Sequence, residues 1–265
     1  MKPYPVGGAA KRRKDAGNGA DAVQPLVNFI VAGVQKAGTT ALYDYLADDP
    51  ALTLSKIKEV HFFDDESVDW SAPDYAPYHA QFAADGPTIR GEATPIYLYW
   101  PGSLERIAAY NPNVRLIVML RDPVERAWSH WRMEYSRGVE AQPFSWCIRQ
   151  GRQRLFEATP WGVHREFSYV ERGFYGEQIE RLFALFPREQ VLILKADDLR
   201  DDPSSTLGKV GDFLGVPRRG AVEHRDVHVG RDVGGDLDAA DVEFLRGLYE
   251  QDMARLKALI GLSFW

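Results

Sequence analysis

A short apolar segment followed by a glycine-containing loop constrains the fold of this chain more than any other feature. Residues 26–33 read LVNFIVAG, and a run of apolar and β-branched residues that ends at a glycine predicts a buried strand. Residues 39–50 read TTALYDYLADDP and place apolar side chains on one helical face before the proline. A buried strand, a glycine loop and a helix in this order predict the first unit of an α/β fold.

The same order of elements returns in the middle of the chain. Residues 114–120, VRLIVML, predict a second buried strand. Asp122 is predicted to cap the helix that follows, with Pro123 at its first position and Glu125 completing a capping box. Gly138 is predicted to end this helix.

The last third of the chain repeats this order once more and then closes with helices. Residues 176–186 predict an amphipathic helix that the following proline ends, and residues 191–194, VLIL, predict a third strand. Residues 202–217 and 238–261 are expected to form two closing helices. Strands that alternate with helices in this way favour a parallel sheet.

This alternation predicts a single α/β domain over residues 26–265, with a central, mostly parallel sheet flanked by helices. Residues 1–25 are rich in glycine and alanine and contain the basic run KRRK, which predicts a disordered tail. No signal-peptide pattern follows this run, and no stretch of 18 apolar residues exists. We therefore expect a cytoplasmic protein without a transmembrane segment.

The composition excludes several classes of function. The formal net charge is −6, which argues against general nucleic-acid binding and means that an anionic ligand must be held by local positive groups. Cys147 is the single cysteine, so neither an internal disulfide nor a cysteine metal cluster is possible. His224 and His228 lie four residues apart in a polar stretch without a third ligand nearby, and we expect no metal site.

The loop after the first predicted strand is similar to a nucleotide-binding loop but differs at its lysine. Gly33 and Gly38 have the glycine spacing of a P-loop, and Thr39 and Thr40 supply hydroxyl groups. A Walker lysine follows the second glycine, whereas Lys36 precedes it. The residues alone leave two interpretations open: a loop for a different anion, or a glycine turn with an exposed lysine.

A second candidate anion site follows the second predicted strand. Arg121 stands at the carboxyl end of this strand, where side chains of a parallel sheet face the ligand crevice. Ser129 comes two helical turns later and can donate to the same anion. The alternative is an arginine paired with a nearby acid and a serine on a solvated helix face.

Together these stretches resemble the sulfotransferases that use 3'-phosphoadenosine 5'-phosphosulfate (PAPS). GVQKAGTTAL, residues 33–42, is similar to the 5'-phosphosulfate loop of that family, and LRDPVERAWSHW, residues 120–131, is similar to its 3'-phosphate motif. KEVHFFD, residues 58–64, resembles the segment that bears the catalytic base in the heparan sulfate branch. The stretches GEATPIYLY and YVERGFYGEQIERLF are also similar, and the resemblance covers about residues 26–215.

The resemblance implies a P-loop-NTPase-like sulfotransferase fold, PAPS as co-substrate, 3'-phosphoadenosine 5'-phosphate (PAP) as product, and no metal. The cofactor-binding residues that it implies are Lys36, Ala37, Gly38, Thr39, Thr40, Arg121, Ser129 and Arg231. Arg231 is included because HVGRD is weakly similar to a basic loop near the C-terminus of the family's members. The heparan sulfate branch usually has a basic residue where this chain has Ala93, which favours a bacterial-type relative.

The implied reaction moves the sulfuryl group to a hydroxyl or amine of a small-molecule or glycan acceptor. Lys36 would neutralise the leaving phosphate, and Glu59 would be the general base. We expect the adjacent aromatic residues to raise the pKa of Glu59 towards neutrality, with His61 as the alternative base. Without the resemblance, a surface ion pair of Glu59 with Lys58 or Lys56 is the simpler interpretation. An ATP-dependent P-loop kinase and a non-catalytic nucleotide-binding module are the alternative classes.

Two further segments have an open role. Residues 64–82, which include DDESVDWSAPDYAPYHAQF, suggest an aromatic rim around an acceptor cleft, or core packing. Residues 149–167 are basic and broken by glycine and proline, which fits a mobile lid or a solvated helix face. The acceptor and the oligomeric state stay open at this stage.

Overall fold

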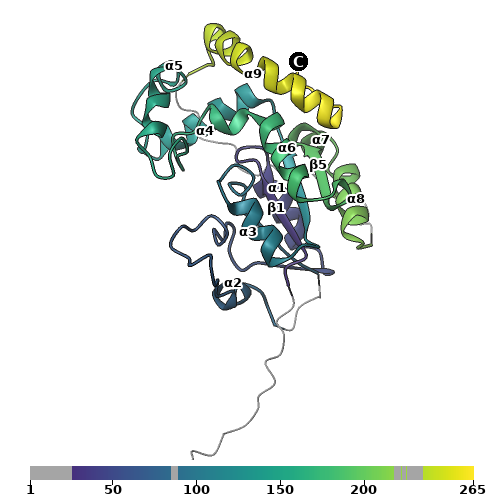
Figure 1. Cartoon of the computed structure of the whole chain (residues 1–265). Coiled ribbons are helices and arrows are strands. Elements are labelled where there is room, and N and C mark those ends of the chain that lie inside the picture. The colour runs from purple at the N-terminus through teal and green to yellow at the C-terminus, as the bar shows by residue number, and fades with distance from the viewer. Residues whose placement is uncertain (1–25, 85–88, 218–221, 223–224, 226–234) are drawn as a thin grey trace, which may run out of the picture.

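The structure is a computed structural model of the chain, and it describes residues 26–84, 89–217, 222, 225 and 235–265 (Figure 1). The predicted tail, residues 1–25, lies outside the described residues. The elements in chain order are β1 Phe29–Gly33, α1 Thr39–Ala47, β2 Leu52–Leu54, α2 Ala76–His79, β3 Ile89–Ala93, α3 Ser103–Tyr110, β4 Arg115–Leu120, α4 Pro123–Ser136, α5 Phe144–Cys147, η1 Gln150–Phe156, η2 Glu171–Gly173, α6 Tyr175–Leu185, η3 Arg188–Gln190, β5 Val191–Lys195, α7 Ala196–Asp201, α8 Pro203–Leu214 and α9 Ala239–Ile260.

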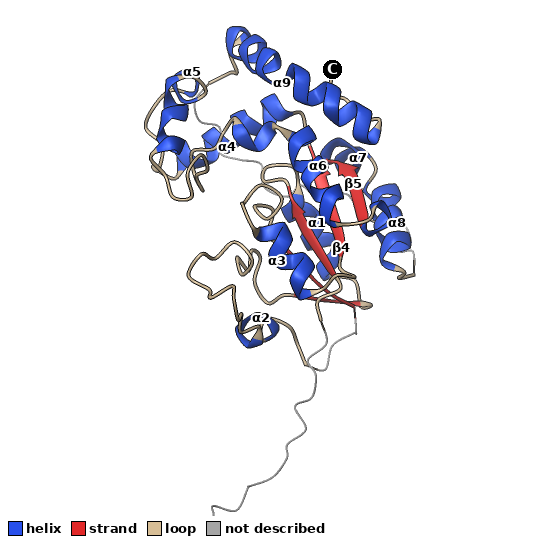
Figure 2. Ribbon diagram, viewed as in Figure 1, coloured by secondary structure: helices blue, strands red, loops and turns tan. Residues whose placement is uncertain are grey.

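The described strands form one five-stranded sheet in the order β2-β3-β1-β4-β5, and all of its pairings are parallel (Figure 2). The predicted single α/β domain with a mostly parallel sheet is therefore confirmed. The strands β1 and β4 are buried along nearly their whole length and pair with each other at the centre of the sheet. Their continuous apolar runs reflect burial on both faces.

Two strands were not predicted from the sequence. The strand β2 has three residues, and β3 has the sequence IRGEA, with a glycine and two charged residues. The sequence of β2, LTL, alternates but is too short to mark a strand, and β3 has neither an apolar run nor an alternation. Pairing with β1 and burial of Arg90 and Glu92 determine the strand conformation of β3, and a local pattern cannot show this.

Helices cover both faces of the sheet. Figure 1 shows α3 and α6 on one face and α1 on the other, and α9 packs along α6. Right-handed crossovers produce this arrangement, because the chain moves from β1 towards β2 in one direction and from β3 towards β4 in the other. The connections that leave β1 and β4 therefore diverge to opposite faces.

The start of α4 only partly follows its prediction. Asp122 caps the helix, since its carboxylate accepts from the backbone N–H groups of Val124 at 2.8 Å and Glu125 at 3.1 Å. The predicted capping box is wrong in its second half, because the Glu125 carboxylate pairs with the guanidinium of Arg121. Gly138 has a φ of 73° just beyond the helix end, as expected for a residue that terminates a helix.

The segment with many aromatic residues packs as core and does not line the cleft described below. Phe62 lies against Trp70 and Tyr75, with ring centroids 5.6 and 5.8 Å apart. Residues 149–167 contain the 3₁₀-helix η1 followed by turns, and both ends are fastened by ion pairs of Arg149 with Asp241 and Arg165 with Asp64. A solvated α-helical face is therefore not observed there.

Candidate active site

The two predicted anion-binding stretches lie side by side at the carboxyl ends of β1 and β4. The backbone N–H of Val34, directly after β1, donates to the carbonyl of Met119 in β4 at 2.8 Å. Because the chain leaves these two strands towards opposite faces of the sheet, a crevice opens between the two connections. Ligands of parallel α/β sheets bind in such a crevice.

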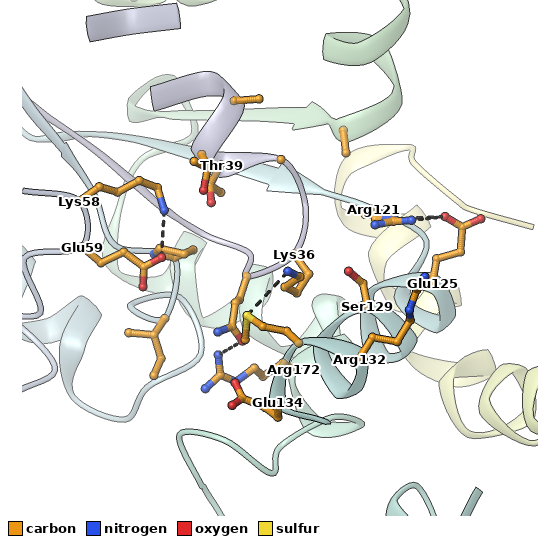
Figure 3. A pocket seen from close by; sticks show the side chains of 18 of the residues that line it. Lys36, Thr39, Lys58, Glu59, Arg121, Glu125, Ser129, Arg132, Glu134 and Arg172 are labelled. Carbon is orange, nitrogen blue, oxygen red and sulfur yellow. Dashed lines mark hydrogen bonds and ion pairs between the residues drawn. The ribbon is translucent and has the colours of Figure 1, made fainter. Parts of the chain in front are cut away.

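A cleft of about 1490 Å³ occupies this place (Figure 3). Eight of the predicted site residues line it: Lys36, Gly38, Thr39, Thr40, Glu59, His61, Arg121 and Ser129. Ala37 does not line it, since its side chain is fully buried and only its backbone can face a ligand. Arg231, together with His224 and His228, lies outside the described residues.

The loop after β1 has the backbone of an anion-binding turn. Gly38 has a φ of 81° and precedes α1, a conformation that a glycine adopts without strain. No described side chain caps α1, and its first turn contains no acidic residue, so the first backbone N–H groups of the helix are available to an anion. Lys36 has a φ of 73°, which is unusual for a residue with a side chain and fits a constrained functional turn.

Lys36 reaches from this loop into the cleft, where its ammonium lies 3.7 Å from the sulfur of Met133 (Figure 3). Burial lowers the pKa of Lys36, and the positive charges of Arg137 and Arg121 lower it further. These charges share one region of the cleft, and their repulsion is relieved when an anion binds between them. The position is therefore suited to a negatively charged ligand.

Arg121 and Ser129 face the same cleft from the start and the second turn of α4. The guanidinium of Arg121 donates to one oxygen of Glu125 from Nε at 3.1 Å and from NH2 at 2.9 Å. Ser129 points towards the space between Lys36 and Arg121 in Figure 3. The structure thus contains the acid pairing that the sequence left open, but the pair lies at the cleft surface, where an incoming anion can replace the carboxylate.

Glu59 lies on the opposite side of the cleft from Arg121, in the connection between β2 and α2 (Figure 3). Its carboxylate is 2.9 Å from the ammonium of Lys58 and 3.4 Å from Nε2 of His61. His61 has a φ of 56° and holds the buried carboxylate of Asp64 through Nδ1 at 3.0 Å. Asp64 also receives the guanidinium of Arg165. These side chains form a continuous chain of charges.

The pKa values of Glu59 and His61 differ from those expected from the sequence. Burial alone raises the pKa of Glu59, but the hydrogen bond with His61 and the charge of Lys58 outweigh it and lower the pKa to about 2. Hydrogen bonds to Asp64 and Glu59 raise the pKa of His61 to about 9. The expectation that aromatic neighbours bring Glu59 towards neutrality is wrong for this state of the protein, because two cationic neighbours dominate.

We expect this His61 ion pair to appear in the pH dependence of stability. The folded-state pKa of about 9 lies above the ordinary 6.5, so the stabilisation is fully present below pH 6.5 and is lost as the pH rises through 9. The free energy of unfolding should therefore fall over this range in the wild type and fall less in His61→Asn. Denaturant titrations at several pH values measure the free energy of unfolding, with His79→Asn as a matched control. If this free energy falls equally with pH in wild type and His61→Asn, the pairing is refuted.

Several cleft residues were not identified as site residues from the sequence. They are Gln35, Lys58, Arg132, Glu134, Arg137, Arg165, Glu166 and Arg172. Arg172 is the most informative of them, since it is 2% exposed and lies within YVERGFY, a stretch that resembles the sulfotransferases. Its guanidinium donates to Gln35 Oε1 at 2.6 Å and to the carbonyl of Arg165 at 2.6 Å. Arg172 therefore supports the anion loop through Gln35. Burial lowers the pKa of Arg172 to about 10.

The cleft is more basic than the chain as a whole. Its basic lining residues are Lys36, Lys58, Arg121, Arg132, Arg137, Arg165, Arg172, Arg200 and Arg225, and its acidic ones are Glu59, Glu125, Glu134, Glu166 and Asp197. A local excess of positive charge in a chain of net charge −6 concentrates anionic ligands at this place. The described residues contain no group of His, Cys, Asp and Glu placed to hold a metal ion. No described helix is long and apolar enough to cross a membrane.

Comparison with known proteins places the chain in a family. The model of the sulfotransferase domain matches residues 27–229, and the chain therefore belongs to the sulfotransferase domain family. A crystal structure of a sulfotransferase from Alicyclobacillus acidocaldarius superposes with a TM-score of 0.75 at 26% identity, over 90% of this chain and 97% of that chain. The predicted sulfotransferase fold is therefore confirmed.

The chain is also similar to curated sulfotransferases. Human heparan sulfate glucosamine 3-O-sulfotransferase 3B1 is 30% identical over 226 residues, which are 80% of this chain and 55% of the relative. Human heparan sulfate glucosamine 3-O-sulfotransferase 3A1 is 33% identical over 196 residues, 73% of this chain and 45% of the relative. The chain spans about half the length of these relatives. The family membership disfavours the alternative of an ATP-dependent kinase.

Proposed function

We propose that the protein transfers the sulfuryl group of PAPS to a hydroxyl or amine of a glycan acceptor. The observation that carries this proposal is the convergence of Lys36, Arg121 and Glu59 on one basic cleft at the carboxyl edge of the sheet. Two of these side chains are cations suited to a nucleotide that carries anionic groups at both its 3' and its 5' position, and the third is a carboxylate suited to proton transfer. The names of the relatives support a glycan as acceptor.

On the donor side, the anion loop binds the 5'-phosphosulfate and the start of α4 binds the 3'-phosphate. The loop supplies the backbone N–H groups of residues 38–40, the Thr39 and Thr40 hydroxyls and the ammonium of Lys36, while the N–H of Ala37 donates to the carbonyl of Val34 within the loop. The guanidinium of Arg121 exchanges its ion pair with Glu125 for one with the 3'-phosphate, and the hydroxyl of Ser129 also donates to this phosphate. A site for two separate anionic groups explains why the lysine stands inside the loop and not after it.

The chemical step is an in-line displacement. The acceptor oxygen or nitrogen forms a bond to sulfur while the bond from sulfur to the bridging oxygen breaks, and PAP leaves with that electron pair. Lys36 stabilises the charge that develops on the bridging oxygen. Glu59 takes the acceptor proton.

The protonation states favour Glu59 over His61 as the base. At neutral pH a group with a pKa of about 9 already carries its proton, so His61 cannot accept another. Glu59 is ionised, but its pKa of about 2 makes it a weak base until its contacts with Lys58 and His61 loosen. Acceptor binding between these side chains would loosen them, because the hydroxyl replaces one of the cationic partners.

The further basic side chains of the cleft support an acceptor that carries negative charges. Lys58, Arg132, Arg137 and Arg165 line the cleft in addition to the cations assigned to the donor. Ala93, which stands where the heparan sulfate branch usually has a basic residue, is fully buried in β3. A localisation in the cytoplasm and a bacterial origin stay predictions.

The nucleotide specificity tests this function directly. In a thermal-shift experiment we expect PAP to stabilise the protein and ATP with magnesium to have a much smaller effect, since binding to the folded state alone raises the melting temperature. A larger shift with ATP and magnesium would favour the kinase class. A non-catalytic module would bind PAP but transfer no labelled sulfate.

We expect the site formed by Arg121 and Ser129 to bind the 3'-phosphate. Loss of one charge-assisted contact costs about 1.5–3 kcal/mol, or about one to two decades in affinity. Calorimetry should therefore show that Arg121→Ala and Ser129→Ala weaken PAP much more than adenosine 5'-monophosphate. The control Glu125→Gln frees Arg121 from its carboxylate and should tighten PAP while leaving the monophosphate unchanged. Equal weakening of both nucleotides would mean that this site binds another group.

A further inference from the structure

A buried glutamate that the proposed reaction does not use lies behind the Glu59 segment. Glu92 stands in β3 and is fully buried. Its two carboxylate oxygens accept from the hydroxyl of Tyr78 at 3.0 Å and from the hydroxyl of Thr94 at 2.6 Å. Burial raises the pKa of Glu92 to about 7. A buried carboxylate is costly to maintain, which calls for a reason in the surrounding structure.

The partners of Glu92 hold the backbone next to Glu59. The Thr94 hydroxyl, which donates to Glu92, accepts from the N–H of Val60 at 2.9 Å. The nearby Tyr97 hydroxyl accepts from the N–H of Phe62 at 3.0 Å. Two peptide N–H groups on the carboxyl side of Glu59 are therefore held by side chains of the turn that follows β3, and Thr94 links one of them to Glu92 in β3.

The second partner of Glu92 holds the aromatic side chains of the same segment. The ring of Tyr78 stacks on Phe62 with centroids 5.0 Å apart and meets Phe63 edge-on, also at 5.0 Å. The hydrogen bond from its hydroxyl to Glu92 restrains where the Tyr78 side chain lies, and with it the surface on which Phe62 and Phe63 pack. One carboxylate thus fixes both the backbone and the ring packing of residues 60–63.

In its ionised form Glu92 can only accept hydrogen bonds, so both hydroxyls donate to it. The Thr94 oxygen then accepts from the N–H of Val60. A glutamine in place of Glu92 would direct an NH₂ group at one of the two hydroxyls, and one hydroxyl hydrogen would lose its acceptor. Such a loss inside the core is expensive relative to the marginal stability of a loop.

We propose that Glu92 is a positioning residue that holds the segment 59–63, and with it the Glu59 carboxylate, against the cleft. This assignment rests on the proposed role of Glu59 only for its effect on turnover. The anchoring itself is a property of the hydrogen bonds and can be measured without any reaction.

The test compares Glu92→Gln and Thr94→Val with the wild type. Thr94→Ser keeps the hydroxyl and should restore wild-type behaviour. Glu140→Gln is the matched control, because Glu140 is another buried carboxylate that accepts a tyrosine hydroxyl, that of Tyr169 at 3.1 Å. The readouts are hydrogen–deuterium exchange of residues 59–63, PAP affinity by calorimetry, and transfer of labelled sulfate from PAPS to heparan sulfate.

In Glu92→Gln and Thr94→Val, amide exchange of residues 59–63 should accelerate roughly tenfold or more, since buried hydrogen bonds are lost. PAP affinity should stay near wild type, and turnover should fall roughly 10- to 100-fold because the base is misplaced. Unchanged exchange in both variants, or equal acceleration in Glu140→Gln, would overturn the inference. Faster exchange with unchanged turnover would uphold the anchoring of the segment and overturn its role in positioning the Glu59 carboxylate.

Discussion

Lys36→Ala should abolish most of the sulfuryl transfer while the protein still binds PAP. The ammonium acts on the bridging oxygen, whose charge develops as the bond to sulfur breaks, so its contribution is largest in the transition state. Loss of one such donor lowers turnover about 10²–10³-fold in comparable oxyanion sites. PAP binding should change much less, because Arg121, Ser129 and the backbone of the loop are intact. Single-turnover kinetics and calorimetry separate the two quantities.

Lys56→Ala is the matched control for this experiment. Its ammonium donates to the carbonyl of Ala80 at 2.8 Å, and it does not line the cleft. Its turnover should therefore equal that of the wild type. A Lys36→Ala variant with a raised Michaelis constant and unchanged turnover would show that Lys36 binds the donor equally in the ground and transition states.

Glu59→Gln should have a comparably large effect for a different reason. Glutamine keeps the size of the side chain and its hydrogen-bonding ability, but it cannot take the acceptor proton. Turnover should fall about 10²–10⁴-fold, the usual range for a general base, while the variant keeps its fold and a PAP affinity near wild type. His61→Asn should have a smaller effect, since His61 tunes and orients the carboxylate but does not receive the proton.

Acceptors of graded pKa sharpen this contrast. An acceptor that is already ionised needs no base, so the defect of Glu59→Gln should shrink as the acceptor pKa falls. The defect of His61→Asn should depend less on the acceptor. If Glu59→Gln stays active on a high-pKa alcohol while His61→Asn is inactive, the proton goes to the histidine, and the assignment of the two residues must be reversed.

The parts of the fold that the sequence predicted are those with a strong local signal. The strands β1 and β4 are continuous apolar runs, and the loops that follow them contain the glycines, the lysine and the arginine of the two anion sites. Because the carboxyl ends of parallel strands lie at one edge of a sheet, these two loops are expected to lie close together. The convergence of Lys36, Arg121 and Ser129 could thus be predicted without coordinates.

The electrostatic state of the site could not be predicted in the same way. The sequence KEVHFFD shows two phenylalanines beside Glu59, but it does not show that Lys58 and His61 both turn their charges to the same carboxylate. Likewise, Arg172 supports Gln35 from 137 residues away along the chain, and no local pattern links the two. Such contacts depend on tertiary packing, as does the burial of Glu92 in β3.

Transfer of radiolabelled sulfate from PAPS to heparan sulfate tests the central claim most directly. The acceptor is incubated with the wild-type protein and PAPS, the labelled glycan is counted, and PAP is quantified in the same samples. We predict label on the glycan in equal amount to the PAP formed, little label with Lys36→Ala, and no phosphate transfer from ATP with magnesium. Transfer of phosphate from ATP, with no transfer of sulfate from PAPS to any acceptor of a hydroxyl and amine panel, would contradict the account.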